Sequence, residues 1–546
     1  MTTQPAQDFT AQTKQLIDGL KSVCANYGLG NDGNEFKIIT QVFLYKFMND
    51  KFGYEIKELE PKLKVAQDGW EKELANYSDE DYELLLLRMP AESARLERQH
   101  FLSNLYQKQN GEEFAKFFDD TLRDIAILNN DIFSVKTGTG AKIKLFDELR
   151  EFITDDSQRD SFCRALVNQL VDFSFEGVFG QKFDFFSTIF EYLIKDYNKD
   201  GGGKYAEYYT PHAVAKIMAS ILVDAPVSDV TCYDPSAGSG TLLMNLAHAI
   251  GEDRCTIYSQ DIAQKSSSML RLNLILNNLV HSIQNIIQGN TLLTPYHRTG
   301  DRLMTFDYVV SNPPFKLDFS DWRDGLDSKQ NNERFFAGIP KILKKDKDKM
   351  AVYLLFIQHI IFSLSARGRA AVVVPTGFLT AQSGIPKRIR EKLVGEKMLR
   401  GVVSMPSNIF ATTGTNVSIL FLDKANKKGD IVLMDASKLG TTVKEGKNQK
   451  TLLSNQEEQT IIETFIRHET QEDFTVVVSY EEIKKKNYSF SAGQYFELKI
   501  EHIDITPEEF AKKLAGYQEY LDSLFSKSRE ADNEIQKQLA RLNYES

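Results

Sequence analysis

Between residues 230 and 422, short apolar runs alternate with segments of helical periodicity, and this alternation constrains the fold more than any other feature. Alternating strands and helices are typical of a mostly parallel sheet with helices packed on both faces. The runs that predict buried strands are 230–233, 256–260, 283–288, 307–310, 370–374, 401–405 and 418–422. We therefore expect an α/β fold with a seven-stranded, mostly parallel sheet.

The segments between these strands have helical patterns at 241–250, 264–277, 351–365 and 387–394. Only a short stretch separates the last two strands. Because it is too short for a crossover helix, we expect these two strands to pair antiparallel. The carboxyl ends of neighbouring parallel strands meet at one edge of such a sheet, which is where open α/β sheets bind their ligands.

The regions on either side of this sheet differ from it in pattern. Residues 8 to 170 are predicted to be mainly helical, and a further helical segment, 183–197, leads into three glycines at 201–203 that indicate a hinge or linker. After a strand at 431–434 the pattern loosens into a lysine-rich loop and mixed α/β structure. The predicted domains are an N-terminal helical domain (1–170), a central domain (171–430) and a C-terminal mixed region (431–546).

The C-terminal tail is predicted to be one long helix. Thr506 is suited to the N-cap, with Pro507 at the first helical position and Glu509 at the third. Apolar residues then recur at alternating spacings of four and three, namely Phe510, Leu514, Tyr517, Leu521 and Leu524. Such a seam predicts a helix that lies against another helix, either in this chain or in a partner.

The formal net charge of −10 argues against a free-standing nucleic-acid binder that depends on bulk electrostatics. Any contact with nucleic acid should therefore come from a local basic surface or from a partner subunit. One candidate surface is the lysine-rich segment 340–349, for which a merely solvated face is the alternative.

The cysteines and the termini indicate a reduced, cytoplasmic protein. None of the four cysteines has the spacing of a metal site or a redox motif, so neither a disulfide nor a bound metal is expected. No run of about 18 apolar residues occurs, as a membrane helix would need. The N-terminus lacks the charged and apolar regions of a signal peptide.

The first predicted strand runs into a glycine-rich turn, Asp234-Pro235-Ser236-Ala237-Gly238-Ser239-Gly240, and then into a helix. Glycines allow a tight turn and let a ligand approach the backbone closely at the helix N-terminus, although they also serve as simple loop residues. The turn lacks both the GxGxxG dinucleotide fingerprint and the GxxxxGKS phosphate loop. Neither a dinucleotide nor a nucleoside triphosphate is therefore indicated.

Polar residues follow the next two strands. Asp261 is placed to accept hydrogen bonds from ribose hydroxyls, and a helix N-cap is its alternative role. Asn290 follows the third strand, where its side chain could reach the edge of an adenine ring. A nucleoside ligand without a phosphate requirement fits these elements, and S-adenosylmethionine is such a ligand.

The fourth strand ends at Asn312-Pro313-Pro314-Phe315. Two consecutive prolines cannot continue a strand ladder, because each lacks an N–H and fixes φ near −65°. The chain therefore leaves the sheet in a rigid turn that presents an amide, a carbonyl and an aromatic face to one small volume. These groups can hold a planar heterocycle with an exocyclic amine; a purely structural exit loop is the alternative.

Together these motifs resemble those of an amino-group DNA methyltransferase, specifically the modification subunit of a type I restriction–modification system, a gamma-type N6-adenine enzyme. Besides the two motifs already described, the matching segments are Tyr208-Tyr209-Thr210-Pro211, 356–359, 367–375 and 405–414. The resemblance covers roughly residues 8 to 425. It implies a Rossmann-like methyltransferase sheet and S-adenosylmethionine as the cofactor.

The resemblance also implies roles for individual residues. Asn312 and the Pro313 carbonyl would accept hydrogen bonds from the target amine, and Phe315 would stack on the base, with Pro314 completing the catalytic motif. Asp261 would bind ribose, Ile262 would lie against adenine, and Asn290 would take a place where such enzymes often carry an acid. The residues that would hold the methionine part of the cofactor, or form the turn around it, are Glu207, Tyr208, Tyr209, Thr210, Pro211, Asp234, Ser236, Ala237, Gly238, Ser239 and Gly240.

The implied reaction methylates the exocyclic N6 of adenine in duplex DNA, without a covalent intermediate, by positioning and by stabilising the charge that develops. The base must first be flipped out of the duplex, and stacking on Phe315 recovers part of that cost. Cytosine-C5 chemistry needs a thiolate, and no cysteine lies near the Pro-Pro turn in sequence. His359, in an apolar helical stretch, is expected to be a packing residue rather than a general base.

The sequence shows no obvious target-recognition domain, so a separate specificity subunit is expected to read the DNA. The N-terminal helices and the tail are its predicted contacts. A second copy of this chain and a restriction (nuclease and translocase) subunit are further expected partners. Two other functions remain open: a methyltransferase that acts on protein glutamine or ribosomal RNA, and a non-enzymatic module retained for assembly.

Overall fold

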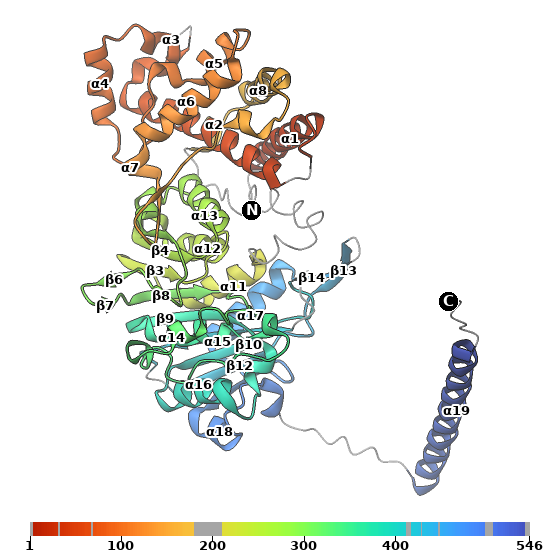
Figure 1. Cartoon of the computed structure of the whole chain (residues 1–546). Coiled ribbons are helices and arrows are strands. Elements are labelled where there is room, and N and C mark those ends of the chain that lie inside the picture. The colour runs from red at the N-terminus through yellow and green to blue at the C-terminus, as the bar shows by residue number, and fades with distance from the viewer. Residues whose placement is uncertain are drawn as a thin grey trace. The chain divides into compact units, whose positions relative to one another are not determined.

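The computed structural model of the chain describes residues 4–30, 33–66, 69–179, 210–410, 416–426, 429–445, 448–496 and 506–540. The chain forms two compact units, Met1–Tyr495 and Phe496–Ser546. In the first unit, N-terminal helices lie beside a large sheet that is covered by further helices (Figure 1). Within the described ranges, no helix combines the length and the apolar character that crossing a membrane requires.

The described part of the N-terminal region is mostly helical, as predicted. Its helices are α1 (Gln4–Asn26), α2 (Gly33–Leu59), α3 (Trp70–Ala75), α4 (Asp79–Arg88), α5 (Leu102–Lys108), α6 (Phe114–Leu128), α7 (Asn130–Phe133), α8 (Asp156–Val171) and α9 (Glu176–Phe179). Helix α2 is buried along most of its length, and its buried residues lie on all sides of the helix. It therefore forms the centre against which α1, α3, α8 and α9 pack.

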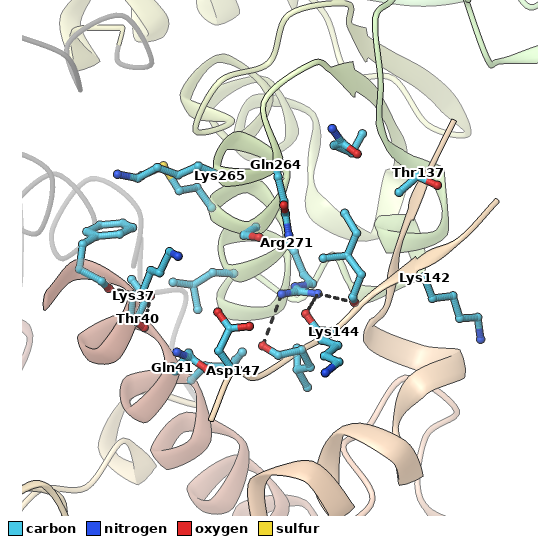
Figure 2. Close-up of a pocket in the computed structure, with 18 residues that line it drawn as sticks. Lys37, Thr40, Gln41, Thr137, Lys142, Lys144, Asp147, Gln264, Lys265 and Arg271 are labelled. Carbon is cyan, nitrogen blue, oxygen red and sulfur yellow. Dashed lines mark hydrogen bonds between the residues drawn. The ribbon is translucent and has the colours of Figure 1, made fainter. Parts of the chain in front are cut away.

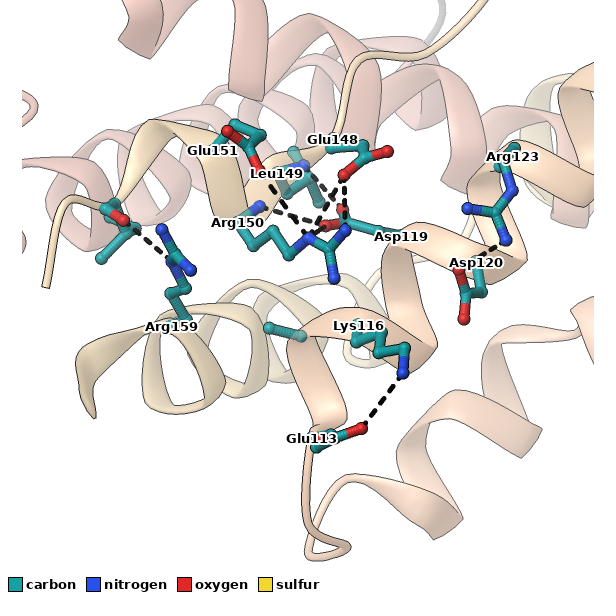
Figure 3. A network of polar contacts seen from close by, with 12 residues as sticks. Glu113, Lys116, Asp119, Asp120, Arg123, Glu148, Leu149, Arg150, Glu151 and Arg159 are labelled. Atoms are coloured by element: carbon teal, nitrogen blue, oxygen red, sulfur yellow. Dashed lines mark hydrogen bonds and ion pairs between the residues drawn. The ribbon is translucent and has the colours of Figure 1, made fainter. Parts of the chain in front are cut away.

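A buried carboxylate on α6 holds the segment around Leu149 and Arg150, which follows β2 (Lys142–Ile143) (Figure 3). Asp119 accepts hydrogen bonds from the backbone N–H groups of Leu149 (2.6 Å) and Arg150 (3.3 Å). The Arg150 guanidinium lies 3.6 Å from the same carboxylate and 2.8 Å from Glu148. Burial raises the pKa of Asp119 to about 6, although the two N–H groups favour its ionised form.

The main sheet has eleven strands within the described residues, in the order β15-β12-β10-β11-β9-β8-β3-β4-β5-β1-β2. Six of the neighbouring pairs are parallel. The strands are β1 (Val135–Thr137), β2 (Lys142–Ile143), β3 (Val230–Asp234), β4 (Cys255–Asp261), β5 (Ile286–Gln288), β8 (Phe306–Ser311), β9 (Leu364–Pro375), β10 (Leu399–Ser404), β11 (Val417–Asp423), β12 (Asp430–Asp435) and β15 (Thr475–Ser479).

All seven predicted strands are present, and the predicted mostly parallel α/β sheet is confirmed. The expected antiparallel pairing of the last two, β10 and β11, is also confirmed, and β11 additionally pairs antiparallel with β9. The predicted number of seven strands was too low. The sheet has eleven among the described residues, because β12 and β15 extend one edge and β1 and β2 extend the other. The predicted third strand begins late, at Ile286, because Val280–Asn285 forms a 3-10 helix in which Ile283 is buried as a strand residue would be.

Helices cover both faces of this sheet. The four predicted between the strands are confirmed as α12 (Thr241–Ile250), α13 (Gln264–Leu276), α15 (Tyr353–Phe362) and α16 (Gly384–Gly395), and α11 (His212–Leu222), α14 (Arg323–Leu326), α17 (Asn455–Arg467) and α18 (Tyr480–Lys485) are also present. Val310 and Ala371 belong to the core shared with α11 and α12. Their chain neighbours Val309 and Val372 point to the opposite face and are equally buried, as a sheet with two covered faces requires.

Two small hairpins complete the first unit, β6–β7 (Arg298–Thr299 with Arg302–Leu303) and β13–β14 (Thr441–Glu445 with Asn448–Leu452). The predicted helix 183–197 and the glycines at 201–203 lie outside the described residues. The predicted boundary at 430/431 falls at the start of β12, which pairs with β10 in the main sheet. The three-domain division stays a prediction.

The second unit contains α19 (Pro507–Ala540), which confirms the predicted long helix. Thr506 and Glu509 exchange hydrogen bonds between side chain and backbone N–H, both of 3.2 Å, as the predicted helix start requires. The apolar seam of α19 is exposed, with Phe510, Tyr517 and Leu521 each at least half accessible. What packs against this seam stays a prediction.

Candidate functional site

The order of the strands places a switch point at β3. The chain proceeds from β3 through α12 to β4 on one side, whereas β8 lies on the other side of β3. All three strands are parallel, so their carboxyl ends share one edge. Ligands of open α/β sheets bind at such a point. The glycine turn follows β3 here, and the Asn-Pro-Pro-Phe motif follows β8.

The glycine turn is held by its own first residue. Asp234 accepts a hydrogen bond from the backbone N–H of Ser236 (2.9 Å). Gly238 and Gly240 have φ values of 54° and 89°, which favour glycine. At Gly240 a Cβ atom would lie 2.3 Å from Leu270 of α13, so close helix packing also requires glycine at that position. Ala237 and Ser239 are buried within the same turn.

Asp261 connects the end of β4 to the glycine turn. One carboxylate oxygen accepts from the backbone N–H of Gly238 (3.0 Å), and the other accepts from that of Ala263 (2.9 Å), just before α13 begins. The second bond resembles the alternative helix-capping role. Burial raises the pKa of this carboxyl group. The next residue, Ile262, is 60% exposed, so its side chain is available to a ligand.

Three of the predicted motifs meet at the carboxyl end of β8. The hydroxyls of Ser236 and Ser311 lie 2.8 Å apart and join the glycine turn to the residue before Asn312. The Asn312 side-chain NH2 donates to the hydroxyl of Thr210 (3.2 Å). Pro211, which follows Thr210, is the N-cap of α11. The predicted residues Glu207, Tyr208 and Tyr209 lie outside the described residues.

The Pro-Pro turn exposes one aromatic side chain and contacts another that the sequence did not indicate. Pro313 is buried and Pro314 is exposed, while Phe315 is partly exposed. The ring of Tyr353, at the start of α15, lies 6.2 Å from the Phe315 ring at an interplanar angle of 73°. Phe378 lies beyond it in the same edge-to-face arrangement. Only the fold brings these rings together, so no local signal identified Tyr353.

Asn290 uses its amide oxygen within the loop after β5. This oxygen accepts from the backbone N–H groups of Leu292 (3.1 Å) and Leu293 (3.0 Å). Its neighbour Thr291 donates to the carbonyl of Pro235 (2.8 Å), which connects this loop to the glycine turn. Because these two bonds occupy the amide oxygen, the NH2 group of Asn290 is the part of the side chain that could contact a ligand.

His359 is a buried packing residue, as expected. Its Nε2 lies 3.1 Å from the Tyr233 hydroxyl. Burial, together with the charges of Arg334 and His297, holds the pKa of His359 well below its usual range. The ring is therefore neutral at physiological pH, and its side chain is buried.

Two further features bear on function. Asp234 is buried, burial raises its pKa to about 8, and it has no ion pair among the described residues. The lysine-rich segment 341–349 is exposed, which is compatible with both a DNA-contacting surface and a solvated face. Among the described residues, no three His, Cys, Asp or Glu side chains gather as a metal site would need.

A comparison with protein families identifies the family of this chain, which the geometry of the strand ends alone does not. The N-6 DNA Methylase model matches residues 181–503, which is more than half of the chain. The chain belongs to the N-6 DNA methylase family. This membership confirms the resemblance to adenine-specific DNA methyltransferases that the motifs indicated.

Curated relatives of this N-6 DNA methylase are methylase subunits of type I restriction enzymes. The MpnII subunit of Mycoplasma pneumoniae is 27% identical over 387 residues, covering 69% of this chain and 66% of the relative. The MjaIX subunit of Methanocaldococcus jannaschii is 26% identical over 395 residues, covering 69% and 67%. The chain thus spans about two thirds of the length of these relatives.

The fold of this N-6 DNA methylase is similar to that of a solved methyltransferase subunit of a type I restriction–modification system from Streptococcus thermophilus. The TM-score is 0.69 at 21% identity, and the comparison covers 90% of this chain and all of the other. A modification subunit of a putative type I restriction enzyme from Vibrio vulnificus gives a TM-score of 0.53 at 17% identity, covering 88% and 96%. These similarities support the fold class.

Proposed function

We propose that this N-6 DNA methylase transfers a methyl group from S-adenosylmethionine to the exocyclic N6 of adenine in duplex DNA. One observation carries the proposal most directly: Asn312 lies in contact with Thr210, and its neighbour Ser311 contacts the glycine turn at Ser236. Motifs separated by about a hundred residues of chain thus meet where open α/β sheets bind ligands.

The residues at the strand ends fit S-adenosylmethionine. Asp234 is a buried carboxyl group with no cationic partner among the described residues, which suits the ammonium group of a methionine. The Asp261 carboxylate is placed for ribose hydroxyls, and exposed Ile262 offers an apolar surface for adenine. Gly238 has the positive φ of 54° that the turn needs, and its N–H holds the Asp261 carboxylate in place. When bound, this cofactor would supply a methyl group activated by an adjacent sulfonium.

The role of Asn312 follows from its contact with Thr210. Because the NH2 group donates to the Thr210 hydroxyl, the amide oxygen is oriented away from that contact and can accept a hydrogen from the target amine. The Pro313 carbonyl is the second acceptor. Two acceptors on one NH2 group hold its lone pair toward the methyl donor and stabilise the positive charge that develops on nitrogen.

Phe315 would stack on the flipped adenine, with the edge of Tyr353 supporting the ring. We assign His359 no part in proton transfer, since its ring is buried and its Nε2 lies against the Tyr233 hydroxyl. The amine proton therefore leaves to water after methylation, once the nitrogen has become strongly acidic. The chain supplies position and charge stabilisation, and it needs no covalent intermediate.

We further propose that the enzyme works as the modification subunit of a type I complex. The named relatives are methylase subunits of such systems. The net charge of −10 leaves little bulk attraction for DNA, so a separate specificity subunit would read the sequence. The exposed seam of α19 is the surface that we assign to that contact. A second copy of this chain and a restriction subunit would complete the complex, in the cytoplasm.

Transfer of labelled methyl groups to duplex DNA, with the specificity subunit present, tests this proposal. Asn312→Ala should lower the transfer rate by about 100-fold or more, because it removes an acceptor that acts on developing charge. The affinity for S-adenosylmethionine should stay within about twofold in calorimetry. Asn332→Ala, at an exposed site, is the matched control.

Other outcomes would favour the competing functions. Label found only in protein or RNA would favour a methyltransferase with those substrates. Absence of transfer with the specificity subunit present, in a chain that still binds the partner, would favour the non-enzymatic module. Loss of cofactor binding in Asn312→Ala would contradict the role assigned to that side chain.

A further inference from the structure

A cavity of about 600 Å³ lies between the N-terminal helices and the methyltransferase sheet (Figure 2). One wall is the side of α2 that carries Lys37, Thr40 and Gln41, and the opposite wall is the side of α13 that carries Lys265 and Arg271. The segment from Lys142 to Asp147, which includes and follows β2, closes a third side. This volume is within the range of sites that bind small molecules, which is about 300–1,000 Å³.

The walls of this cavity are strongly basic in a chain that is acidic overall. Five basic side chains line it, namely Lys37, Lys142, Lys144, Lys265 and Arg271, whereas Asp147 is the one carboxylate among the described lining residues. The Lys142 amine is already paired with Asp131, outside the cavity. Burial lowers the pKa of Lys265 to about 8, and the positive charge of nearby Lys37 contributes to the shift.

Arg271 keeps a cation at the base of the cavity. Its guanidinium is buried and donates to the backbone carbonyls of Ile143 (3.3 Å), Lys144 (3.1 Å) and Leu145 (3.5 Å). These neutral acceptors bind its N–H groups, and the carboxylate of Asp147 is the one negative charge that acts on it from the described lining. Burial lowers the pKa of Arg271 only to about 10, so it remains charged at pH 7. The surroundings therefore favour a bound anion.

Gln41, on the α2 wall of the same cavity, adds a hydrogen-bond donor. Its side chain is only 8% exposed, and its oxygen accepts from the backbone N–H of Asp147. Its NH2 group is buried and has no hydrogen-bond partner among the described residues. A buried donor without a partner costs about 1–3 kcal/mol, which an acceptor oxygen on a ligand would recover.

We propose that this cavity binds a small phosphate-bearing molecule. Its phosphate oxygens would accept from the Gln41 NH2 group and lie among Lys37, Lys144, Lys265 and Arg271. The apolar side chains of Met269 and Leu272 line the same space and suit an uncharged body attached to the phosphate. Because the site is concave and lies between two helices, it fits a molecule of nucleotide size better than the wide, rod-like duplex.

Helix α13 connects this cavity to the strand-end site. It begins three residues after Asp261, and Asn273 on the same helix donates to the Ser239 carbonyl in the glycine turn (2.8 Å). Gln288, which lines the cavity, donates to the carbonyl of Ile262 (2.9 Å). A ligand that contacts α13 should therefore change cofactor affinity. This coupling rests on the proposed function, whereas anion binding does not.

The test is calorimetry on the full chain with inorganic pyrophosphate, with uridine diphosphate, and with uridine as the control without phosphate. The two phosphate compounds should bind, and uridine should not.

Lys37→Gln and Lys144→Gln, both at exposed positions, should each weaken binding about fivefold. Gln41→Glu, which keeps the acceptor but replaces the donor with a negative charge, should weaken it at least about tenfold. Lys142→Gln, the matched control, should change it less than about twofold, because that amine is paired elsewhere.

The proposal is overturned if pyrophosphate and uridine diphosphate do not bind at millimolar concentration, or if the two exposed lysine variants bind them as the unmodified chain does. It is also overturned if these variants weaken only the binding of a short DNA duplex.

For the coupling, saturating pyrophosphate should change the dissociation constant of S-adenosylmethionine by about fivefold. An unchanged constant would refute the coupling alone. Failure of S-adenosylmethionine to bind would refute the proposed function, while the pyrophosphate result stands by itself.

Discussion

Two buried carboxyl groups, one in the helical region and one at the strand ends, have different partners. Asp119 accepts from two backbone N–H groups and faces the Arg150 guanidinium, as Figure 3 shows. Asp234 also accepts from a backbone N–H, but its side-chain contacts are the hydroxyls of Ser236 and Ser311, and no cation pairs with it among the described residues. Burial raises the pKa of Asp119 to about 6 and that of Asp234 to about 8.

The difference shows why burial by itself does not identify a functional carboxylate. Asp119 has its cation within the fold, so its charge is balanced and it serves to attach one segment to α6. Asp234 lies at a strand end beside the glycine turn, where a cationic ligand can balance its charge. We therefore expect the partner, rather than the depth of burial, to distinguish a structural carboxylate from a ligand-binding one.

The strongest test of this distinction replaces the unpaired carboxylate. Asp234→Asn keeps the shape of the side chain and an acceptor oxygen but cannot ionise when a cationic ligand binds, so S-adenosylmethionine should bind about 100-fold more weakly. Titration calorimetry measures this change, with Asp119→Asn as the comparison variant that should bind normally. Equal affinities for both variants would show that Asp234 does not balance a cationic ligand.

The second test removes the paired carboxylate. Asp119→Ala leaves the buried N–H groups of Leu149 and Arg150 without their acceptor, so the free energy of unfolding should fall by about 2 kcal/mol. Urea denaturation measures this loss. Asp120→Ala, on the same helix and in a solvent-exposed ion pair with Arg123, should cost less than about 0.5 kcal/mol. Similar losses for both would mean that the Asp119 contacts stabilise nothing.

The third test uses pH. A raised carboxyl pKa means that the folded state holds its proton more tightly, so the stability that it contributes is full below the unfolded pKa of about 3.9 and is lost as pH rises to the folded pKa. For Asp119 this loss ends at about pH 6, and for Asp234 it continues to about pH 8. Between pH 6 and 8 the free energy of unfolding should therefore fall by about 1 kcal/mol per pH unit. Asp234→Asn should remove this slope, and a slope that persists would assign it to another group.

Sequence patterns predicted the strands that are long and apolar, and the motifs at their ends. The short strands β1 and β2 were missed because they carry Lys136 and Lys142 and have no apolar alternation. The positions of motif residues such as Asn312 and Asp261 could be predicted, because each follows the end of a recognisable strand and the strand order brings those ends together. Their individual roles in binding and catalysis stay predictions.

The remaining features depend on contacts between distant segments. Tyr353 reads as one more apolar residue of α15, and only the fold brings its ring to Phe315. Gln41 lies within a helix whose buried residues face all sides, so its unpaired NH2 group has no local signature. The basic cavity likewise requires α2 and α13 to meet, and neither helix alone predicts it.

The pairing of β1 with β5 makes the N-terminal region part of the central sheet. Lys136 and Thr137 lie opposite Ile287 and Gln288 in a parallel ladder, and β2 then forms the outermost strand. A chain that began after residue 170 would lose both strands and expose the backbone N–H and C=O groups along β5. Open strand edges of this kind recruit other chains into intermolecular sheets. The helical region thus also protects the catalytic sheet from aggregation.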